Sequence, residues 1–315
     1  MPTSTSITDE LAAIRTSAAI YPLISRAFLR ITGSDATRWL NGMVTNNIAA
    51  VAPGEGNYNF LLNAQGRIQG DCTIYREPGD GPATYLLETD KSQLDAIQIH
   101  LDKFIIMDDV ELTPAFTEDE SLIILGPNTP ALLQHLSLPS PAPFRFVEAS
   151  TPHGIVLIFT SALVELRAAT ATINALRSEI SAPEVSTEAL EAFRILSAIP
   201  KFGVDIREKD LPQETAQTRA LHFSKGCYLG QEIVERIHSR GQVHRIFTQF
   251  TLTGEMPTFP APLESNSKPA GELTSAALID CTIYALGYVR REFLETDQPL
   301  SYPGGSATPK LTTGS

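Results

Sequence analysis

The chain twice places a strand-like run of residues directly before a helix-like run, and this order constrains the fold more than any other feature. "AFLRITG" (27–33) alternates and ends in glycine, and apolar residues then follow at helical spacing from Trp39 to Val44. Ser34 and Asp35 stand at the N-cap of that expected helix. "SLIILGPNTPALLQHL" (121–136) repeats the order of strand, glycine, cap and helix.

Two further runs also resemble each other. "TYLLETDKSQLDAIQIHL" and "ALVELRAATATINALRSEI" (162–180) both begin as a strand and continue as a helix. "NYNFLLNAQGRIQGDCTIYRE" (57–77) predicts a hairpin, with its turn at 63–66. The pattern indicates two α+β modules. Either an internal duplication or the ordinary alternation of an α+β protein explains it.

The character of the sequence changes after residue 241. "HRIFTQFTLTG" and "TIYALGYVRREF" are typical of strands, and a proline-rich stretch separates them. We expect a small all-β domain there. The last residues, "SYPGGSATPKLTTGS", are rich in Gly, Pro, Ser and Thr, and we expect them to be disordered.

Composition excludes several classes of function. The 315 residues carry a formal net charge of -12, which argues against general binding to nucleic acid or to a membrane surface. No apolar run approaches the length of a membrane span. The first residues resemble neither a secretory signal nor a mitochondrial presequence, so we expect a cytoplasmic protein.

The three cysteines, Cys72, Cys227 and Cys281, are widely spaced and form no C-x-x-C pair. A disulfide framework and a zinc ribbon are therefore not expected, and neither is a stably bound metal. Cys72 and Cys281 lie in strand-like runs, which favours a role in core packing for both.

Cys227 lies in the unusual stretch "KGCYLGQEIVERIHSRG" (225–241). Gly230 is a candidate N-cap for a helix with an apolar stripe, which places Cys227 within about one turn of a helix N-terminus. That N-terminus and the nearby Lys225 favour a thiolate, and Gly226 permits a close approach or a positive φ. The alternative is that Cys227 is a small buried apolar residue.

A second candidate site follows the predicted hairpin turn. Arg67 could bind an anion, and Asp71 could act as an acid or base. The alternative is a hairpin whose polar residues are merely solvated. The stretch "IPKFGVDIREKDLPQE" (199–214) describes a long ordered loop that either lines a cavity or only connects elements.

"KGCYLGQE" resembles the motif of the YgfZ-type folate-binding proteins, which act in iron–sulfur cluster assembly or repair. The segments "FLRITGSDATRWLNGMVTNNI", "GNYNFLLNAQGRIQGD", "RILSAIPKFGVDI", "LPQE", "RGQVHR" and "LGYVRREF" follow the order of that family. They are shared with a wider superfamily that includes the aminomethyltransferase T-protein of glycine cleavage.

The resemblance implies an α+β, aminomethyltransferase-like fold in three parts around a central folate-binding opening. The parts would be an N-terminal folate-binding region (1–115), a ferredoxin-like module that carries the cysteine motif (116–244), and a C-terminal β-barrel with a disordered tail (245–315).

It also implies a tetrahydrofolate-binding accessory protein for iron–sulfur client enzymes, such as tRNA methylthiolation enzymes. The expected partners are folate and iron–sulfur client or assembly proteins, without direct contact to nucleic acid or membrane. Cys227 would be the working thiol, tuned by Lys225 and the helix N-terminus, and would either carry a transient disulfide or share a cluster ligand with a partner. The rival hypothesis is a tetrahydrofolate-dependent aminomethyl or one-carbon transferase with Asp71 as its acid or base. A third alternative is a scaffold protein that folate only orders.

Two departures from the superfamily make standard aminomethyl transfer doubtful. Gly70 and Asp71 replace a pair of aspartates, and Leu196 replaces a glutamate that holds the pterin. Asp71 and Glu214 become the candidates for that contact. The cations expected for the glutamate tail are Lys225, Arg67, Arg194, Arg236 and Arg240, and the remaining predicted contacts are Asn63, Gly226, Tyr228, Gln231 and Glu232.

Overall fold

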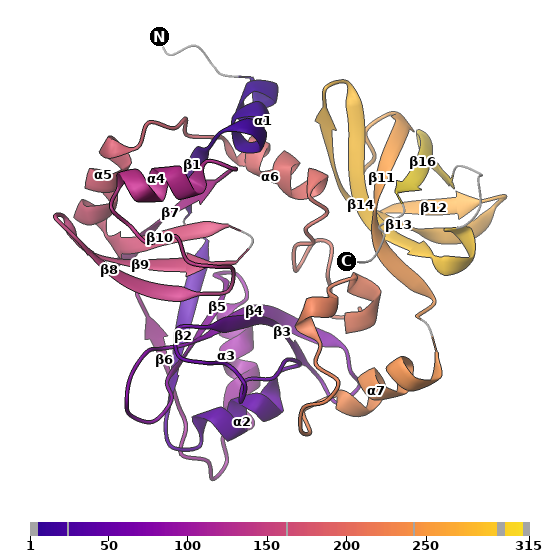
Figure 1. Ribbon diagram of the computed structural model, residues 1–315. Coiled ribbons are helices and arrows are strands. Elements are labelled where there is room, and N and C mark those ends of the chain that lie inside the picture. Colours follow the sequence, from indigo (N-terminus) through magenta and orange to yellow (C-terminus); the bar gives the residue numbers. More distant parts are fainter. Residues whose placement is uncertain (1–5, 24, 162, 242, 295–299, 311–315) are drawn as a thin grey trace.

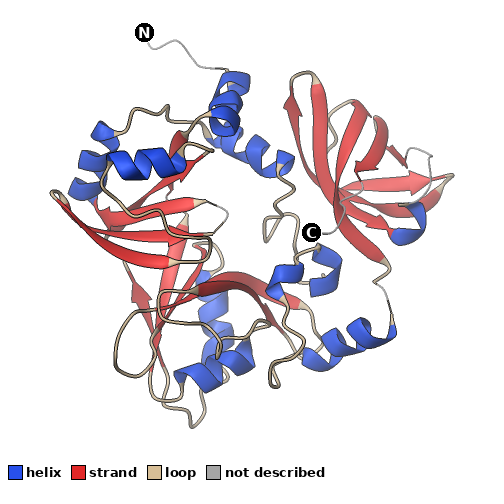
Figure 2. Ribbon diagram, viewed as in Figure 1, coloured by secondary structure: helices blue, strands red, loops and turns tan. Residues whose placement is uncertain are grey.

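The computed structural model describes residues 6–23, 25–161, 163–241, 243–294 and 300–310. Three parts lie around the centre of the molecule, with the N-terminal helix at the top of the view and the last strands in the part on the right (Figure 1). Two parts combine sheets with helices, and the third is built almost entirely of strands (Figure 2). The predicted α+β class is therefore confirmed.

The first part is a five-stranded antiparallel sheet with two helices. Its strand order is β3-β4-β5-β2-β6. The elements are β2 (Arg26–Thr32), α2 (Ala36–Met43), β3 (Gly56–Leu62), β4 (Ile68–Arg76), β5 (Tyr85–Asp90), α3 (Leu94–Asp102) and β6 (Glu111–Ala115). The predicted hairpin of residues 57–77 is β3–β4, with Gly66 at φ 71° in its turn.

The second part repeats this topology. Its order is β1-β7-β10-β9-β8, so β7, β8, β9 and β10 take the places of β2, β3, β4 and β5. The elements are β1 (Ala19–Leu23), β7 (Asp119–Leu125), α4 (Thr129–His135), β8 (Phe146–Thr151), β9 (Gly154–Thr160), β10 (Val164–Ala169) and α5 (Thr170–Glu179). The shared order and helix positions support duplication over chance alternation. The edge strand β1, however, comes from the N-terminus, so residues 1–115 do not form one separate unit.

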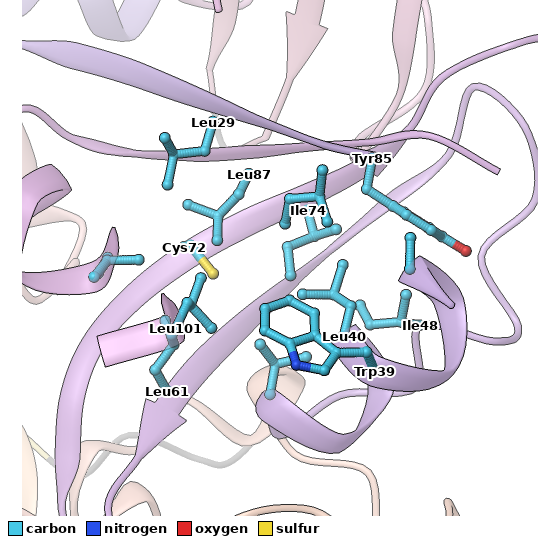
Figure 3. Packing of buried hydrophobic residues seen from close by; sticks show 14 residues of the cluster. Leu29, Trp39, Leu40, Ile48, Leu61, Cys72, Ile74, Tyr85, Leu87 and Leu101 are labelled. Atoms are coloured by element: carbon cyan, nitrogen blue, oxygen red, sulfur yellow. The ribbon is translucent and has the colours of Figure 1, made fainter. Parts of the chain in front are cut away.

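The core of the first part lies between its sheet and its two helices. Trp39 and Leu40 of α2 and Ile97 and Leu101 of α3 pack there. Figure 3 shows Cys72 inside this core, close to Leu87 and Leu101. Burial raises the pKa of the Cys72 thiol well above its usual range, so Cys72 is a packing residue, as predicted.

Aromatic rings join the two sheets. Phe28 of the first sheet packs against Phe159 of the second, with ring centroids 4.8 Å apart. Phe146 stacks on Phe159 at the same centroid distance. Arg26 pairs with the buried Glu88 beside these rings, at 3.2 Å. The buried ring contacts hold the two modules together.

The third part is a closed six-stranded barrel in the order β11-β14-β13-β12-β15-β16. Its strands are β11 (Arg245–Gly254), β12 (Ala261–Ser265), β13 (Lys268–Ile279), β14 (Thr282–Arg290), β15 (Leu300–Tyr302) and β16 (Gly305–Lys310), with the 3₁₀ turn η3 (Arg291–Phe293) after β14. The predicted C-terminal barrel is confirmed.

The expected disordered tail is wrong for residues 301–310. β15 and β16 complete the barrel, because β16 pairs with β11 while Leu300, Tyr302 and Ala307 fill the barrel interior. Residues 311–315 lie outside the described part.

Cys281 also differs from expectation. It stands with Asp280 in the two-residue turn between β13 and β14, where both residues have positive φ (47° and 63°). A turn of this kind points its residues outward, and Cys281 is exposed rather than packed in the core.

The remaining elements bridge the three parts. They are α1 (Ile7–Thr16), α6 (Thr187–Leu196), the 3₁₀ turns η1 (Pro212–Thr215) and η2 (Thr218–Ala220), and α7 (Gln231–Arg240). α1 and α6 share one core with β7 and the barrel residue Ile279. None of the described helices combines the length and apolar character needed to cross a membrane.

Candidate functional site

The cysteine loop, residues 223–230, leads into α7 and is attached to the first module. The backbone N–H of Leu229 donates to the carbonyl oxygen of Gly42 in α2, at 3.0 Å. Cys227 is exposed in this loop. The alternative of a buried packing role for Cys227 is therefore wrong, and the thiol is accessible to other molecules.

The cysteine motif and the β3–β4 turn, two separate features of the sequence, meet in space. Gly230 has φ 82°, and a Cβ there would lie 2.6 Å from the carbonyl oxygen of Asn63. Gly66 has φ 71°, and its Cβ would lie 2.8 Å from Cβ of Ile233. Two glycines therefore allow the start of α7 to press against the hairpin turn, where larger residues would not fit.

The structure corrects the role predicted for Lys225. Its side chain is buried, and the ammonium donates to the carbonyl oxygens of Val44 at 2.7 Å and Asn46 at 2.5 Å. It also lies 4.9 Å from the centre of the Tyr228 ring. None of its described contacts is to the Cys227 thiol. Through these two hydrogen bonds Lys225 anchors the cysteine loop instead of pairing with a thiolate. Burial lowers the pKa of Lys225 to about 7.

Of the two roles predicted for Gly226, the positive φ is wrong, and the close approach of a ligand stays a prediction. A Cβ at this position would meet no heavy atom within 4 Å, and the backbone is not in the left-handed region. The glycine required by the backbone is Gly230, four residues further on. The reason is that the close approach occurs at the start of α7 and not beside the cysteine.

The other motif residues divide between the core and the surface. Tyr228 is buried among apolar residues, and burial together with the charge of Glu235 raises the pKa of its hydroxyl above the usual range. Gln231 accepts a hydrogen bond from the Tyr228 N–H at 3.3 Å. Glu232 and Arg236 are exposed on α7. The side chain of Arg240 lies outside the described part of the structure.

Asp71 is held on both of its carboxylate oxygens. Tyr58 donates its hydroxyl to Oδ2 at 2.6 Å, and the Gln93 amide donates to Oδ1 at 2.8 Å. Burial and the Asp71 charge together raise the pKa of Tyr58 well above its usual range. Asp71 thus sits in a polar cluster inside the first module.

Several predicted folate contacts serve the fold. The Asn63 side chain accepts the N–H of Arg67 at 3.0 Å and so closes the hairpin turn. Arg67 itself donates to the carbonyl oxygen of Lys209 at 2.5 Å. Both residues thus already have protein partners.

Two more predicted contacts lie in salt-bridge networks. Arg194 pairs with Asp205 and with Glu191, each at 2.5 Å. Glu214 accepts the Arg245 guanidinium at 3.1 Å. The sequence could not show these pairs, because it reveals which residues are charged but not which charges have partners in the fold.

A cavity of about 680 Å³ opens between α6, the 3₁₀ turns, α7 and the barrel strand β11. Residues that line it include Gln213, Gln217, Arg219, Phe223, His238 and Phe247. None of the residues predicted to contact folate is among those that line it.

The cavity wall has two unusual features. Phe223 and His238 stack with ring centroids 3.8 Å apart and an interplanar angle of 12°. Ala198 and Ala216, both in the wall, have positive φ values of 52° and 57°, which are uncommon outside glycine and concentrate at functional sites. The loop of residues 199–214, for which the sequence left open whether it lines a cavity, contributes Ile199, Pro212 and Gln213 to this wall. The sequence did not indicate the rest of the wall.

The architecture is that of the aminomethyltransferase T proteins. Over 98% of this chain, the structure superposes on glycine cleavage system aminomethyltransferase T from Bartonella henselae with a TM-score of 0.85, covering 89% of that chain at 18% sequence identity. Residues 1–157 match the GCV_T family, the GCVT N-terminal domain. The predicted fold is therefore confirmed, and the chain has a GcvT-like N-terminal region.

Curated relatives carry a more specific name. The chain is 28% identical over 282 residues to the "Iron-sulfur cluster assembly factor IBA57 homolog, mitochondrial" of Aspergillus oryzae, covering 80% of this chain and 60% of that protein. It is 29% identical to the protein of the same name from Aspergillus clavatus, covering 79% and 62%. The chain spans about three fifths of the length of these relatives.

Proposed function

We propose that this protein is a YgfZ-type accessory factor for the assembly or repair of iron–sulfur clusters, with Cys227 as its working thiol. The observation that carries the proposal is the exposed thiol on a loop attached to both α2 and the hairpin turn. The names of the relatives support the same role.

A single thiolate cannot hold a cluster alone, because clusters need several cysteine ligands. Cys227 therefore acts as one ligand beside ligands of a client or assembly protein, and its thiol proton leaves on coordination. An attached loop suits this role, since the sulfur can be presented without a large loss of conformational entropy. The clients implied by the family resemblance are [4Fe–4S] enzymes such as those of tRNA methylthiolation.

We also propose that the cavity beside α7 holds tetrahydrofolate or a derivative. Its volume lies in the range of ligand pockets, and Phe223 and Phe247 offer apolar faces for the rings. Arg219 supplies a cation for the glutamate tail. Gln213 lines the cavity, and its Oε1 is buried without a hydrogen-bond partner among the described residues. An amide oxygen in that state fits an amino group of the pterin, which replaces the carboxylate contact expected of Asp71 or Glu214.

The rival hypothesis, aminomethyl or one-carbon transfer with Asp71 as acid or base, gains less support. Both oxygens of Asp71 are occupied by Tyr58 and Gln93, and Asp71 is not among the residues that line the cavity. A transferase would need its acid or base within reach of the bound folate.

Complementation tests the cluster function. Cells that lack this protein receive the wild type, Cys227→Ala or Cys281→Ala, and the activity of [4Fe–4S] enzymes is measured. Cys281 is also exposed, so it is a matched control for the loss of a surface thiol. We expect Cys281→Ala to restore activity and Cys227→Ala to fail at equal protein level. Restoration by both variants would refute the proposal.

Titration calorimetry with tetrahydrofolate tests the cavity. Gln213→Leu should weaken binding about tenfold, since the pterin would lose a buried acceptor. Asp71→Asn should leave affinity unchanged. If instead Asp71→Asn weakens binding while Gln213→Leu does not, and if folate turnover depends on Asp71, the transferase hypothesis is favoured.

The compartment stays a prediction. The sequence favours the cytoplasm, whereas the relatives are named as mitochondrial. Fluorescence microscopy of the full-length gene product, fused to a fluorescent protein at its C-terminus, distinguishes a cytoplasmic from a mitochondrial location.

A further inference from the structure

The loop between α3 and β6 exposes two adjacent large apolar side chains. Ile106 is 81% exposed and Met107 is 93% exposed, the two highest values among the exposed large apolar residues described. Ile99, on the preceding helix α3, is 57% exposed. Neighbouring large apolar side chains with this degree of exposure, such as Ile106 and Met107, are typical of interaction surfaces.

The loop is firmly attached although its apolar side chains are exposed. The Ser34 hydroxyl and N–H donate to Oδ2 of Asp109 at 2.7 and 2.9 Å, and the Asp109 N–H donates to Asp35 at 2.9 Å. At the other end of the loop, the Trp39 indole donates to the carbonyl oxygen of Phe104 at 3.1 Å. A loop fixed at both ends presents its side chains with little ordering cost on binding.

The same helix holds the cysteine loop. α2 contacts Phe104 through Trp39, and it accepts the Leu229 N–H through Gly42. These two residues are three positions apart, which is about 4.5 Å along a helix axis. In Figure 1 both loops lie at the lower edge of the molecule, near α2. A partner interface of about 800 Å² per side is roughly 30 Å across, wide enough to cover both.

The charges around the loop restrict the partner. Asp102, Asp109 and Glu111 are exposed carboxylates beside the apolar pair. Of the nearby cations, Arg38 is paired with Asp108 at 2.6 Å, and Lys103 is exposed. A second copy of this chain on the same surface would bring like charges together, and an anionic membrane would do the same. The partner surface that complements this loop is an apolar pocket with a rim of lysine or arginine.

We propose that Ile106 and Met107 form the docking site for the iron–sulfur protein that Cys227 serves, and that this protein presents an apolar pocket with a basic rim. This inference rests on the proposed cluster function. It adds a recognition site separate from the thiol, so that the partner is seated on the loop while its cluster faces Cys227.

Photocrosslinking in cells tests the docking site directly. Benzoylphenylalanine replaces Met107 in the full chain, and in a control chain it replaces Leu278, a barrel residue that is 58% exposed. We expect position 107, and not 278, to crosslink an iron–sulfur protein identified by mass spectrometry. Reversing the acidic charges beside the loop with Asp102→Lys and Glu111→Lys should lower the crosslinking yield about tenfold. Crosslinks only to a second copy of this chain, only to lipid, or equally from both positions would overturn the proposal.

A functional comparison separates this inference from the proposal it rests on. The double variant Ile106→Ser with Met107→Ser should lower support of cluster enzymes about tenfold, while Leu278→Ser should not. Unchanged alkylation of Cys227 in the double variant shows that the fold and the thiol are intact. If Cys227→Ala fails while the double variant supports cluster enzymes fully, the docking site is wrong and the cluster function stands. If Cys227→Ala gives full support, the cluster function itself is wrong.

Discussion

Three glycines near the site allow the fit of the cysteine loop to be measured. An alanine at Gly226 meets no atom within 4 Å and needs no left-handed backbone. An alanine at Gly203 also meets nothing, but it must adopt φ 82°. An alanine at Gly230 must adopt φ 82° as well, with Cβ only 2.6 Å from the Asn63 oxygen and 3.0 Å from Leu62 Cβ. The three positions thus separate backbone strain from steric overlap.

The expected losses of unfolding free energy follow from these environments. Gly226→Ala should change stability by less than about 0.5 kcal/mol, or raise it slightly by restricting the unfolded chain. Gly203→Ala should cost about 1 to 2 kcal/mol for the left-handed conformation. Gly230→Ala should cost about the same for its left-handed conformation and a further ~1 to 3 kcal/mol for overlap with a backbone oxygen. The total expected loss is about 2 to 5 kcal/mol.

Urea unfolding of the three variants and the wild type measures these differences, with the slope of the transition checked for constancy. Amide hydrogen exchange of residues 223–230 should rise only in Gly230→Ala, because only that change separates the loop from the hairpin turn. If Gly230→Ala loses no more stability than Gly203→Ala, the contact between the cysteine motif and the turn does not hold the loop, and the reasoning fails.

Three further results are expected. Maleimide should label Cys227 and Cys281 in the folded protein and Cys72 only after unfolding. Mass spectrometry assigns the labelled site. Labelling of Cys72 in the folded protein would contradict its burial. Lys225 has a pKa of about 7 when folded and about 10.4 when unfolded, so the unfolded chain binds more protons between these values. The free energy of unfolding of the wild type should therefore rise relative to Lys225→Met from pH 7 to pH 10, and parallel urea midpoints across that range would disprove it. Arg245→Met should cost about 3 kcal/mol in thermal or urea unfolding, since it removes the guanidinium that pairs with the buried Asp210 and Glu214. A loss below about 1 kcal/mol would show that this pairing is not needed.

Local patterns in the sequence predicted the elements well where one segment contains the whole signal. The hairpin of 57–77 has both alternating residues and a turn that needs a glycine with positive φ, and it forms as expected. The helix after Asp35 and the barrel strands near 245–254 and 282–290 follow the same rule. The final strands were missed because only a few apolar residues, such as Leu300 and Ala307, alternate there with Gly, Pro, Ser and Thr.

The site was predicted less well, because its properties depend on contacts between distant segments. The sequence indicated Cys227 as a special thiol, but not that Lys225 would turn inward to the carbonyl oxygens of Val44 and Asn46. The cavity is assembled from segments that are adjacent only after folding, so Arg219 and His238 had no local signal.

The position of β1 has a consequence for the synthesis of the chain. β1 pairs with β7, whose first residue lies about 100 positions later, so at about 5–20 residues per second the strand waits roughly 5–20 s on the ribosome for its neighbour. During that interval the first module can close completely, since all five of its strands lie between Arg26 and Ala115. The second module, in contrast, cannot be released as a fragment by cutting the chain after the first one, because its edge strand would remain with the other piece. A chain divided near residue 116 should recover its full structure only when both fragments are present together.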